Sequence, residues 1–275
     1  MRCTKAIIPV AGYGTRWLPL TKSIEKCMLP IGNRPIVDYT VQDCAKAGIT
    51  DIYFVVGQDS TQLQDYYSRD VVLESYLKKK GRGDIIDNIT PPRGVTFHYI
   101  EQDLNKAYGT AVPIALCRSY IPKGEPVLIC MGDDCVYSDP GVECDLERLV
   151  VAAEQSGTAA MLGVQIPISQ VERYGVIETN DRNEFVQIVE KPKPSDAPSN
   201  QINVGKYVFT SELLDECVKY ESQKQINGEF YITEPINTYV ENAVMIVIPT
   251  NGAYLDAGTV DGWLHANQFI AEQSR

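Results

Sequence analysis

A glycine-containing loop followed by three cations is the first feature of the sequence that could do chemistry. The loop starts at Ala11, directly after the apolar run Ala6–Val10, and Arg16, Lys22 and Lys26 come soon after its glycines. Because glycine has no side chain, backbone N–H groups in such a loop can approach phosphate oxygens closely. Three cations beside it suit a triphosphate, although an ordinary surface loop with solvated charges is the other interpretation.

This loop does not match the two commonest phosphate-binding motifs. A dinucleotide fingerprint needs a glycine at position 17, where this chain has Trp17, and no Gly-Lys-Ser/Thr of a P-loop follows at the required spacing. Pro19 also stands where either motif would already be helical. We therefore expect an open loop. A nicotinamide-dependent dehydrogenase is disfavoured, because a ribose-binding carboxylate about 20 residues further on is also missing.

Two aspartates that follow predicted strands are candidate metal ligands. Asp133 comes just after the buried run Val127–Met131, and Asp256 follows Ala253–Leu255. Open α/β sheets bind ligands at the carboxyl ends of their strands, and Mg²⁺ is commonly held by one or two carboxylates together with phosphate oxygens. Each aspartate alone could equally cap a turn or a helix. Asp134 is the weaker candidate and is expected to face away or to cap the next turn.

The elements that must position these residues follow an α/β pattern. Short β-branched runs alternate with amphipathic segments, which predicts a mainly parallel sheet covered on both faces. The expected strands are Ala6–Val10, Ile52–Val56, Thr96–Ile100, Val127–Met131, Ala159–Gln165, Val176–Thr179, Phe185–Glu190, Ile202–Phe209 and Val244–Ile248. The expected helices are Pro35–Ala47, Gly109–Tyr120, Asp145–Ser156, a helix capped by Ser211 that runs to about Tyr220, Thr233–Asn242 and Val260–Gln273. The strands Val176–Thr179 and Phe185–Glu190 alternate in polarity and are expected to be antiparallel.

Composition limits the classes of function. The chain has 275 residues, with 25 Lys and Arg against 36 Asp and Glu, a formal net charge of −11. This balance argues against partners such as nucleic acid or an anionic membrane surface, and no run approaches the roughly 20 apolar residues of a membrane span. The two histidines lie far apart, which excludes a His-rich metal site. Eight scattered cysteines fit small core residues in a reducing compartment, so we expect a cytoplasmic protein.

The loop sequence also resembles a known family. Gly12-x-Gly14-Thr15-Arg16-x-Leu18-Pro19-x-Thr21-Lys22, followed by Lys26-x-Met28-Leu29-Pro30, is similar to the signature of the sugar nucleotidyltransferases, and within them to the bacterial uridylyltransferases. Further landmarks occur in the same order along nearly the whole chain. They are a polar insertion at 59–90, Gln102, Tyr108-Gly109-Thr110-Ala111, Gly132-Asp133, Tyr174-Gly175-Val176, Glu190-Lys191-Pro192, Val204-Gly205-Lys206-Tyr207, Gly228-Glu229 and Asp256-Ala257-Gly258.

The resemblance implies a Rossmann-like three-layer αβα fold with a mixed, mostly parallel central sheet. We expect one domain, 1–275, with a nucleotide-binding half at about 1–140 and a sugar-binding and assembly half at about 141–275. The implied reaction is Mg²⁺-assisted transfer of a uridylyl group from UTP to α-D-glucose 1-phosphate, which yields UDP-glucose and pyrophosphate, in a homo-oligomer (dimer or tetramer). The same chemistry with dTTP or another sugar 1-phosphate, and a non-catalytic sugar-nucleotide-binding paralogue, stay open.

The resemblance also implies roles for individual residues. Arg16, Lys26, Asp133 and Lys191 are the implied catalytic residues, and Asp133 and Asp256 the implied metal ligands. The implied nucleotide-binding residues are Ala11, Gly12, Gly14, Thr15, Arg16, Lys26, Gln102, Gly109 and Asp133. The implied sugar-phosphate-binding residues are Gly175, Glu190, Lys191 and Gly205.

Three features depart from the family's pattern. Glu25 places a negative charge beside Lys26 and is expected to weaken its hold on phosphate, while Cys27 is expected to leave an exposed thiol. The segment Gly228–Tyr231 lacks the glutamine that uridylyltransferases often carry there. These departures leave the implied reaction class intact and bear on rates and on sugar preference.

Overall fold

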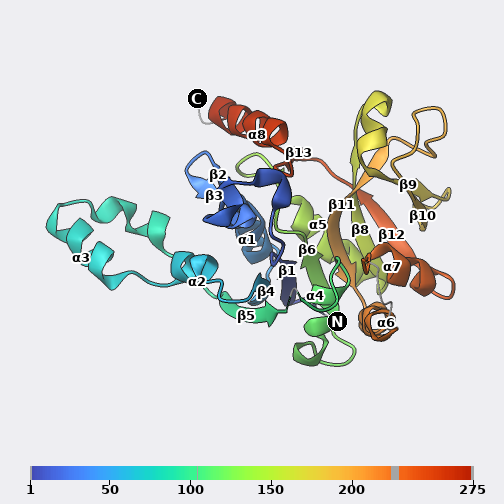
Figure 1. Ribbon diagram of the computed structural model, residues 1–275, viewed down its shortest axis with the longest axis horizontal. Helices are drawn as coiled ribbons and strands as arrows, with labels where there is room; N and C mark the ends of the chain where they lie inside the picture. The colour runs from blue at the N-terminus through green and yellow to red at the C-terminus, as the bar shows by residue number, and fades with distance from the viewer. Residues whose placement is uncertain (1, 104, 224–228, 274–275) are drawn as a thin grey trace.

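A computed structural model describes residues 2–103, 105–223 and 229–273 of the chain. Its main feature is a nine-stranded sheet in the order β10-β9-β11-β6-β1-β4-β5, with β8 paired to β11 and β12 paired to β8 (Figure 1). The strands are β1 (Lys5–Pro9), β4 (Asp51–Gly57), β5 (Thr96–Gln102), β6 (Val127–Cys130), β8 (Ala159–Gln165), β9 (Gly175–Thr179), β10 (Phe185–Glu190), β11 (Gln201–Phe209) and β12 (Met245–Pro249). Within this described sheet only β10 and β11 run against the other strands, so the predicted mixed, mostly parallel sheet is confirmed.

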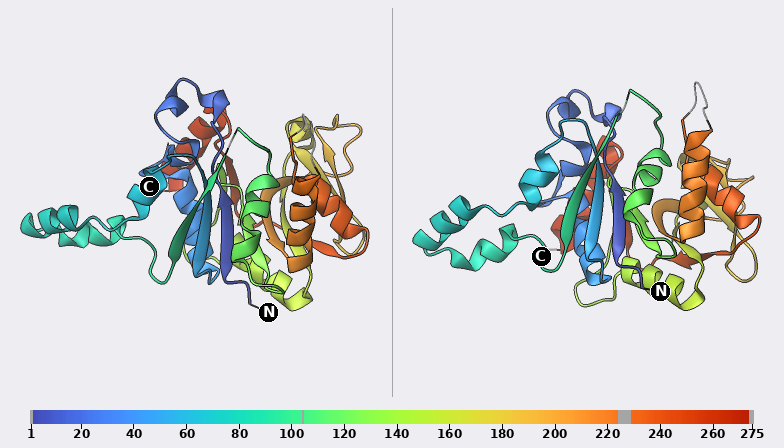
Figure 2. Two further views of the ribbon diagram at one scale, coloured as in Figure 1. Left: turned by 60° about the horizontal axis from the view of Figure 1, so that its bottom comes forward. Right: turned by 90° about the horizontal axis from the view of Figure 1, so that it is seen from below.

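Helices cover both faces of the sheet, as predicted (Figure 2). On one face, α1 (Ile36–Lys46) and α5 (Asp145–Ser156) contribute to one buried apolar cluster. On the other face, α4 (Val112–Leu116), α6 (Ser211–Ser222) and α7 (Thr233–Val240) contribute to a second cluster. The two clusters account for a three-layer αβα arrangement.

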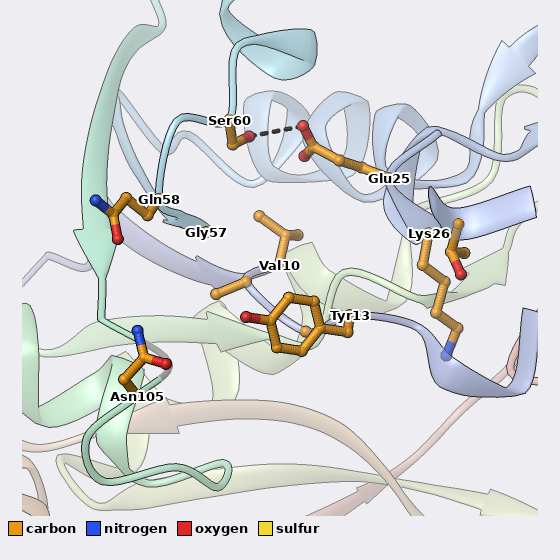
Figure 3. A pocket seen from close by; sticks show the side chains of 11 residues that line it. Val10, Tyr13, Glu25, Lys26, Gly57, Gln58, Ser60 and Asn105 are labelled. Atoms are coloured by element: carbon orange, nitrogen blue, oxygen red, sulfur yellow. Dashed lines mark hydrogen bonds between the residues drawn. The ribbon is translucent and has the colours of Figure 1, made fainter. Parts of the chain in front are cut away.

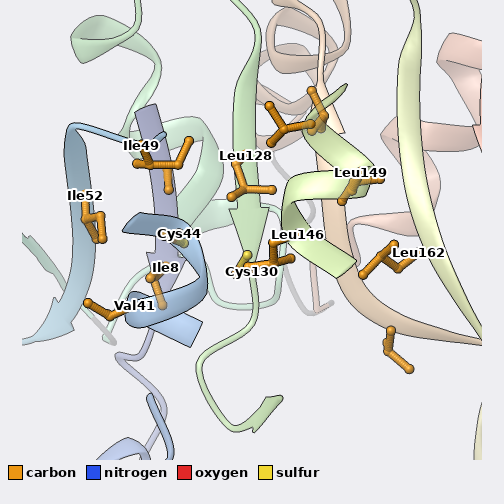
Figure 4. Close-up of a cluster of buried hydrophobic side chains, with 14 of the residues drawn as sticks. Ile8, Val41, Cys44, Ile49, Ile52, Leu128, Cys130, Leu146, Leu149 and Leu162 are labelled. Carbon is orange, nitrogen blue, oxygen red and sulfur yellow. The ribbon is translucent and has the colours of Figure 1, made fainter. Parts of the chain in front are cut away.

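The strands supply side chains to both clusters because successive residues of a strand point to opposite faces. Ile8 of β1 belongs to the cluster under α1 and α5, whereas its neighbour Ile7 belongs to the cluster on the other face. Figure 4 shows Ile8 and Leu128 near Val41 of α1 and Leu146 of α5. Each such fully buried aliphatic side chain contributes roughly 1.5–3 kcal/mol. All eight cysteines are free and buried, so their predicted role as core residues is confirmed.

Two predicted helix starts are wrong, for local reasons. The helix expected from Ser211 is capped by the preceding residue, since the Thr210 side chain accepts a hydrogen bond from the backbone N–H of Leu213. The helix expected from Gly109 starts only at Val112, because the preceding segment pairs with another loop: the N–H of Ala111 donates to the carbonyl of Phe230 at 2.9 Å.

A short two-stranded ribbon lies outside the main sheet. It consists of β7 (Asp134–Tyr137) and β13 (Ala253–Asp256), which run antiparallel and pair Asp134 with Asp256. The C-terminal helix α8 (Val260–Gln273) packs against this ribbon and against the hairpin of β2 (Pro30–Ile31) and β3 (Arg34–Pro35) through a third apolar cluster. Strand β7 was not predicted, and its pairing with β13 sets Asp256 opposite the residue that follows Asp133.

The polar insertion forms helices that extend away from the sheet. After α2 (Gln62–Tyr67), the segment with α3 (Val71–Lys79) and a 3₁₀ helix at Gly83–Ile89 projects from the body of the molecule (Figures 1 and 2). None of the described helices is long and apolar enough to cross a membrane.

Candidate active site

The glycine loop is open, as predicted, and leads from β1 into a short 3₁₀ turn at Thr15–Trp17. Gly14 adopts a φ of +60°, and a Cβ there would lie 2.9 Å from Cγ2 of Thr21, so both conformation and space require glycine. The Thr21 hydroxyl donates to the Gly14 carbonyl at 2.9 Å, which fixes the turn. A Cβ on Gly12 would meet nothing within 4 Å, so the loop backbone faces open space here.

Trp17 ties this loop to the other end of the chain. Its buried indole N–H donates to the carbonyl of Ala257 at 3.1 Å, and its ring meets Trp263 of α8 edge-on at 5.8 Å. Next to it, Arg16 Nη1 lies 3.7 Å from the Cβ position of Gly258. The anchor therefore holds an exposed guanidinium beside the turn that follows Asp256. In the sequence Trp17 served only to exclude a dinucleotide motif, and nothing there indicated its partner.

Lys26 and Asp133 meet directly at the carboxyl end of β6. Lys26 Nζ lies 2.5 Å from Asp133 Oδ2. Burial alone would raise the pKa of Asp133, but the ammonium groups of Lys26 and Lys206 outweigh it and hold the pKa below its ordinary value. The Asp133 side chain is 44% exposed, so an ionised carboxylate remains accessible to a ligand.

Asp256 ends β13 and is paired with Asp134, the residue after Asp133. Asp256 Oδ1 accepts a hydrogen bond from the N–H of Gly258 at 2.6 Å. Burial and the Asp256 carboxylate raise the pKa of the Tyr174 hydroxyl. The ribbon thus brings both candidate metal ligands to one place, next to Arg16 and Lys26.

The two carboxylates of Asp133 and Asp256 fit a magnesium ion that is bound by protein and substrate together. Among the described residues no group of three or more His, Cys, Asp or Glu side chains forms a complete metal cage. Mg²⁺ is commonly bound by one or two carboxylates, while phosphate oxygens and water molecules occupy its remaining coordination positions. Asp133 and Asp256 would hold it.

Asp134, the weaker candidate, does not cap a turn. It is buried, and its carboxylate accepts hydrogen bonds from Lys206 Nζ and from the Tyr254 hydroxyl, the latter at 2.9 Å. Lys206 had appeared in the sequence only as part of a landmark. A lone lysine inside an apolar strand was the one signal that could have indicated a buried ion pair.

A pocket of about 220 Å³ opens where β1 and β4 end. The Tyr13 ring crosses it, with Gln58 and Asn105 on one side and Lys26 on the other (Figure 3). Glu25 lies on its wall and accepts a hydrogen bond from the Ser60 hydroxyl at 2.7 Å. The expectation that Glu25 weakens Lys26 receives no support from this arrangement, because Glu25 pairs with Ser60 while Lys26 pairs with Asp133.

The expectation that Cys27 leaves an exposed thiol is wrong. Cys27 is only 3% exposed, and burial raises its pKa well above the ordinary range. The 3₁₀ turn Lys26–Met28 points Lys26 toward Asp133 and buries the next side chain in the core under α1.

Two of the implied nucleotide-binding residues, Gln102 and Gly109, lie at the end of β5 and against Phe230, respectively. Gln102 ends β5, pairs with Gly57 and is 4% exposed, and among the described residues its side-chain amide has no hydrogen-bond partner. Gly109 has a φ of +119°, and a Cβ there would lie 2.4 Å from the backbone nitrogen of Phe230, so no other residue fits. Gly228, the first residue of the segment that lacks the family's glutamine, lies outside the described residues.

The residues implied to bind the sugar phosphate lie on β9, β10 and β11. Gly175 pairs with Glu190, and a Cβ on Gly175 would lie 3.0 Å from Glu190 Oε1. Gly205 packs against Met131 and accepts that residue's backbone N–H at 2.9 Å. Lys191 is exposed and adopts a φ of +47°, a strained conformation for a residue other than glycine that is common at functional sites.

Tyr174 contacts both Lys191 and the strand that carries Asp256. Its carbonyl accepts the N–H of Lys191 at 3.0 Å, and its ring meets that of Tyr254 edge-on at 6.4 Å. By contrast, Gln102 ends β5 at the opposite end of the strand order, and no described contact joins Gln102 or Gly109 to Lys191.

Comparison with known proteins agrees with this geometry. Residues 5–273 match the family described as nucleotidyl transferase. A UTP–glucose-1-phosphate uridylyltransferase from Staphylococcus epidermidis is 35% identical over 94% of this chain and 89% of its own length. A UTP-bound enzyme from Acinetobacter baumannii superimposes with a TM-score of 0.86 at 26% identity, over 98% of this chain and 93% of that one. A UDP-glucose pyrophosphorylase complexed with UDP-glucose has a TM-score of 0.82 at 27% identity, over 98% and 99%. The chain belongs to the nucleotidyl transferase family.

Proposed function

We propose that this protein transfers a uridylyl group from UTP to α-D-glucose 1-phosphate and releases pyrophosphate, so that it makes UDP-glucose. The observation that carries the proposal is the convergence of Lys26 on Asp133 beside an open glycine loop, with Asp256 on the neighbouring strand. The relatives named for this reaction, and the related structures that hold UTP and UDP-glucose, supply the identity of the substrates.

The reaction needs positioning and charge neutralisation more than a protein nucleophile. An oxygen of the sugar phosphate attacks the α-phosphorus of UTP in line, and pyrophosphate leaves from the opposite side. Burial raises the pKa of thiols such as Cys27 and Cys217, which argues against covalent catalysis by them. The work therefore falls to the cations and to the two aspartates.

Each charged residue has a distinct role in this proposal. Arg16 and Lys26 hold the triphosphate and then the leaving pyrophosphate. Lys191 binds the attacking phosphate, and Glu190 holds sugar hydroxyls. When a triphosphate arrives, Lys26 exchanges part of its interaction with Asp133 for phosphate oxygens, which frees carboxylate oxygens on Asp133.

The metal is a divalent cation, and we propose Mg²⁺. Bound by Asp133 and Asp256, it supplies positive charge that neutralises the phosphate oxygens. The support is the donor set: two carboxylates, both at strand ends, with a neighbouring loop that is open to phosphates.

The remaining attributes are proposals of the same kind. We take the chain as one domain, with residues 1–140 binding the nucleotide and 141–275 binding the sugar and making assembly contacts, in a dimer or tetramer. Eight free, buried cysteines support a reducing compartment and hence a cytoplasmic location. Light scattering on the purified protein measures the oligomeric state.

The test is pyrophosphate release, measured with UTP, dTTP, CTP, ATP and GTP against glucose 1-phosphate and several other sugar 1-phosphates. The highest kcat/KM is expected for UTP with glucose 1-phosphate. Turnover with another pair at a higher kcat/KM would replace the proposed substrates, and no turnover with any pair would favour a non-catalytic sugar-nucleotide-binding paralogue.

A further inference from the structure

Beneath the two metal-binding aspartates lies a buried ion pair that the proposed chemistry does not use. Lys206 of β11 is 1% exposed, and its ammonium group contacts the carboxylate of Asp134. The same ammonium donates to the carbonyls of Met131 at 2.9 Å and of Asp134 at 3.4 Å. The second oxygen of the Asp134 carboxylate accepts the hydroxyl of Tyr254 at 2.9 Å.

Stability alone does not account for this arrangement. Removing a carboxylate and an ammonium group from water is costly, and well-packed apolar residues of similar volume are often at least as stabilising. Burial lowers the pKa of Lys206, but the charge of Asp134 outweighs it and the pKa lies above the ordinary value, so the side chain is an ammonium ion. A charge is therefore kept in the core, directly behind the site.

The contacts of Lys206 surround one short segment. Met131 comes two residues before Asp133 and Asp134 comes directly after it, and Lys206 binds the carbonyls of both. Between them Gly132 is packed tightly, since a Cβ there would lie 2.4 Å from Cγ1 of Val10. The backbone that carries Asp133 is thus held on both sides by a single ammonium group.

The same network reaches the second aspartate. Tyr254, which donates to Asp134, lies on β13 two residues before Asp256, and Asp256 is the register partner of Asp134. Lys206 and Asp134 therefore connect three strands: β11, β7 and β13. A displacement of Lys206 or Asp134 would change the separation of the two metal-binding carboxylates.

We propose that Lys206 is a positioning residue, which acts through Asp134 and the two bound carbonyls to hold Asp133 and Asp256 at the separation that a shared divalent cation requires. This inference rests on the proposed function, because that function assigns the cation to these two aspartates. Catalytic groups displaced by about 1 Å commonly lose around a hundredfold in rate, so such support has large consequences.

The decisive variant removes the positioning contacts and keeps the buried charges balanced. Lys206→Met/Asp134→Asn replaces the ion pair with neutral side chains of similar size. The matched control is Lys5→Met/Glu125→Gln, which removes a lysine–carboxylate pair with a 2.8 Å contact at the start of β1. Each protein is first checked for its melting temperature.

Two measurements separate positioning from folding. The first is kcat with UTP and glucose 1-phosphate at saturating Mg²⁺. The second needs no turnover: calorimetric titration with α,β-methylene-UTP, with and without Mg²⁺, gives the gain in affinity that the metal provides. We expect the double variant to bind the analogue without Mg²⁺ within about twofold of wild type, to lose most of the metal-dependent gain, and to lose at least about tenfold in kcat. The control variant keeps all three values.

Lys206→Arg supplies a rescue, because a guanidinium offers several donors at the same position. It is expected to retain the metal-dependent gain and a kcat within about threefold of wild type. Wild-type kcat and metal-dependent gain in the double variant would overturn the proposal, as would equal losses of affinity with and without Mg²⁺.

If the double variant does not fold, Tyr254→Phe decides the question, because it keeps the ring and removes only the hydroxyl that binds Asp134. A fall of about threefold or more in the metal-dependent gain supports the positioning network, and an unchanged gain contradicts it. Failure of the proposed function can be told apart from failure of this inference. If the proposed function is wrong, wild-type protein releases no pyrophosphate from UTP and glucose 1-phosphate. The binding measurement, which needs no turnover, still tests the role of Lys206.

Discussion

Lys26 Nζ and Asp133 Oδ2 lie 2.5 Å apart, so a cation of the glycine loop neutralises a carboxylate that is proposed to bind the metal. The pair joins two segments separated by 107 positions in the sequence. It holds the loop over the carboxyl end of the sheet, where the triphosphate is proposed to bind. The predictions below follow from this arrangement and from the groups around it.

Removing either metal-binding charge should abolish most of the activity. Asp133→Asn and Asp256→Asn are expected to lower kcat by at least roughly a hundredfold, as loss of a strong electrostatic stabiliser usually does. Steady-state pyrophosphate release at saturating Mg²⁺ measures the effect. Asp181→Asn, at an exposed turn, is the control. Near-wild-type turnover in Asp133→Asn or Asp256→Asn would show that the substituted aspartate is not a metal ligand.

Lys191 should act on the sugar phosphate and not on UTP. Lys191→Ala is expected to raise KM for glucose 1-phosphate at least about tenfold and to change KM for UTP little. Lys193→Ala, two residues further along the same exposed segment, should change neither value. Equal damage to both substrates would instead place Lys191 on the triphosphate.

Gln102 should set the choice of base. Uracil presents acceptor and donor groups that a buried amide can meet, whereas cytosine reverses them at two positions and would leave buried groups unpaired at about 1–3 kcal/mol each. Gln102→Ala is therefore expected to reduce the preference for UTP over CTP by about tenfold or more. Ratios of kcat/KM measure this, with dTTP expected to be used but poorer, because only a methyl group distinguishes it. If ATP proves the best donor, the uridylyl assignment is wrong.

The Trp17 anchor should matter for catalysis more than for stability. Trp17→Phe keeps an aromatic ring but removes the hydrogen bond to the Ala257 carbonyl, at a cost of about 1 kcal/mol. We expect kcat/KM for UTP to fall several-fold, with only a small change in melting temperature. Trp263→Phe is the comparison, since this residue of α8 loses its indole hydrogen bond to the carbonyl of Pro30 on β2 instead. A variant with unchanged kcat/KM would show that the loop keeps its position without this bond.

The cysteines should resist thiol reagents in the native protein. Burial raises the pKa of Cys3 to about 12 and that of Cys27 still higher, so at pH 8 these groups are protonated as well as inaccessible. Native protein is expected to react slowly with Ellman's reagent and to release eight equivalents after unfolding in guanidinium chloride. If one thiol of the native protein reacted rapidly and this reaction disappeared in Cys27→Ser, Cys27 would be exposed, as expected from the sequence.

Much of the fold could be predicted because its signals are local. Asp145–Ser156 reads as a helix from its apolar period and from Gly157, and the structure ends that helix there with Gly157 at a φ of +68°. Strand Ala159–Gln165 is continuous and apolar because it is buried on both faces. The site's loop was also readable, since its glycines and cations lie close together in the sequence.

The parts that could not be predicted depend on distant partners. Strand β7 has four residues, and its pairing with β13 crosses more than a hundred positions, so no periodicity indicates it. Lys206 looks like a polar interruption of a strand until Asp134 is placed beside it. The buried side chain of Cys27 depends on α1 and the sheet, neither of which the neighbouring residues specify.

The bond from Trp17 to Ala257 spans 240 positions, which has a consequence for how the enzyme is made. On the ribosome the glycine loop emerges well before Ala257 and the helix that carries Trp263, since some 240 positions separate them. Domains of a growing chain fold as their segments become available. A nascent chain can thus build much of its sheet while the loop lacks its anchor, so that UTP meets a finished site only after Ala257 has emerged.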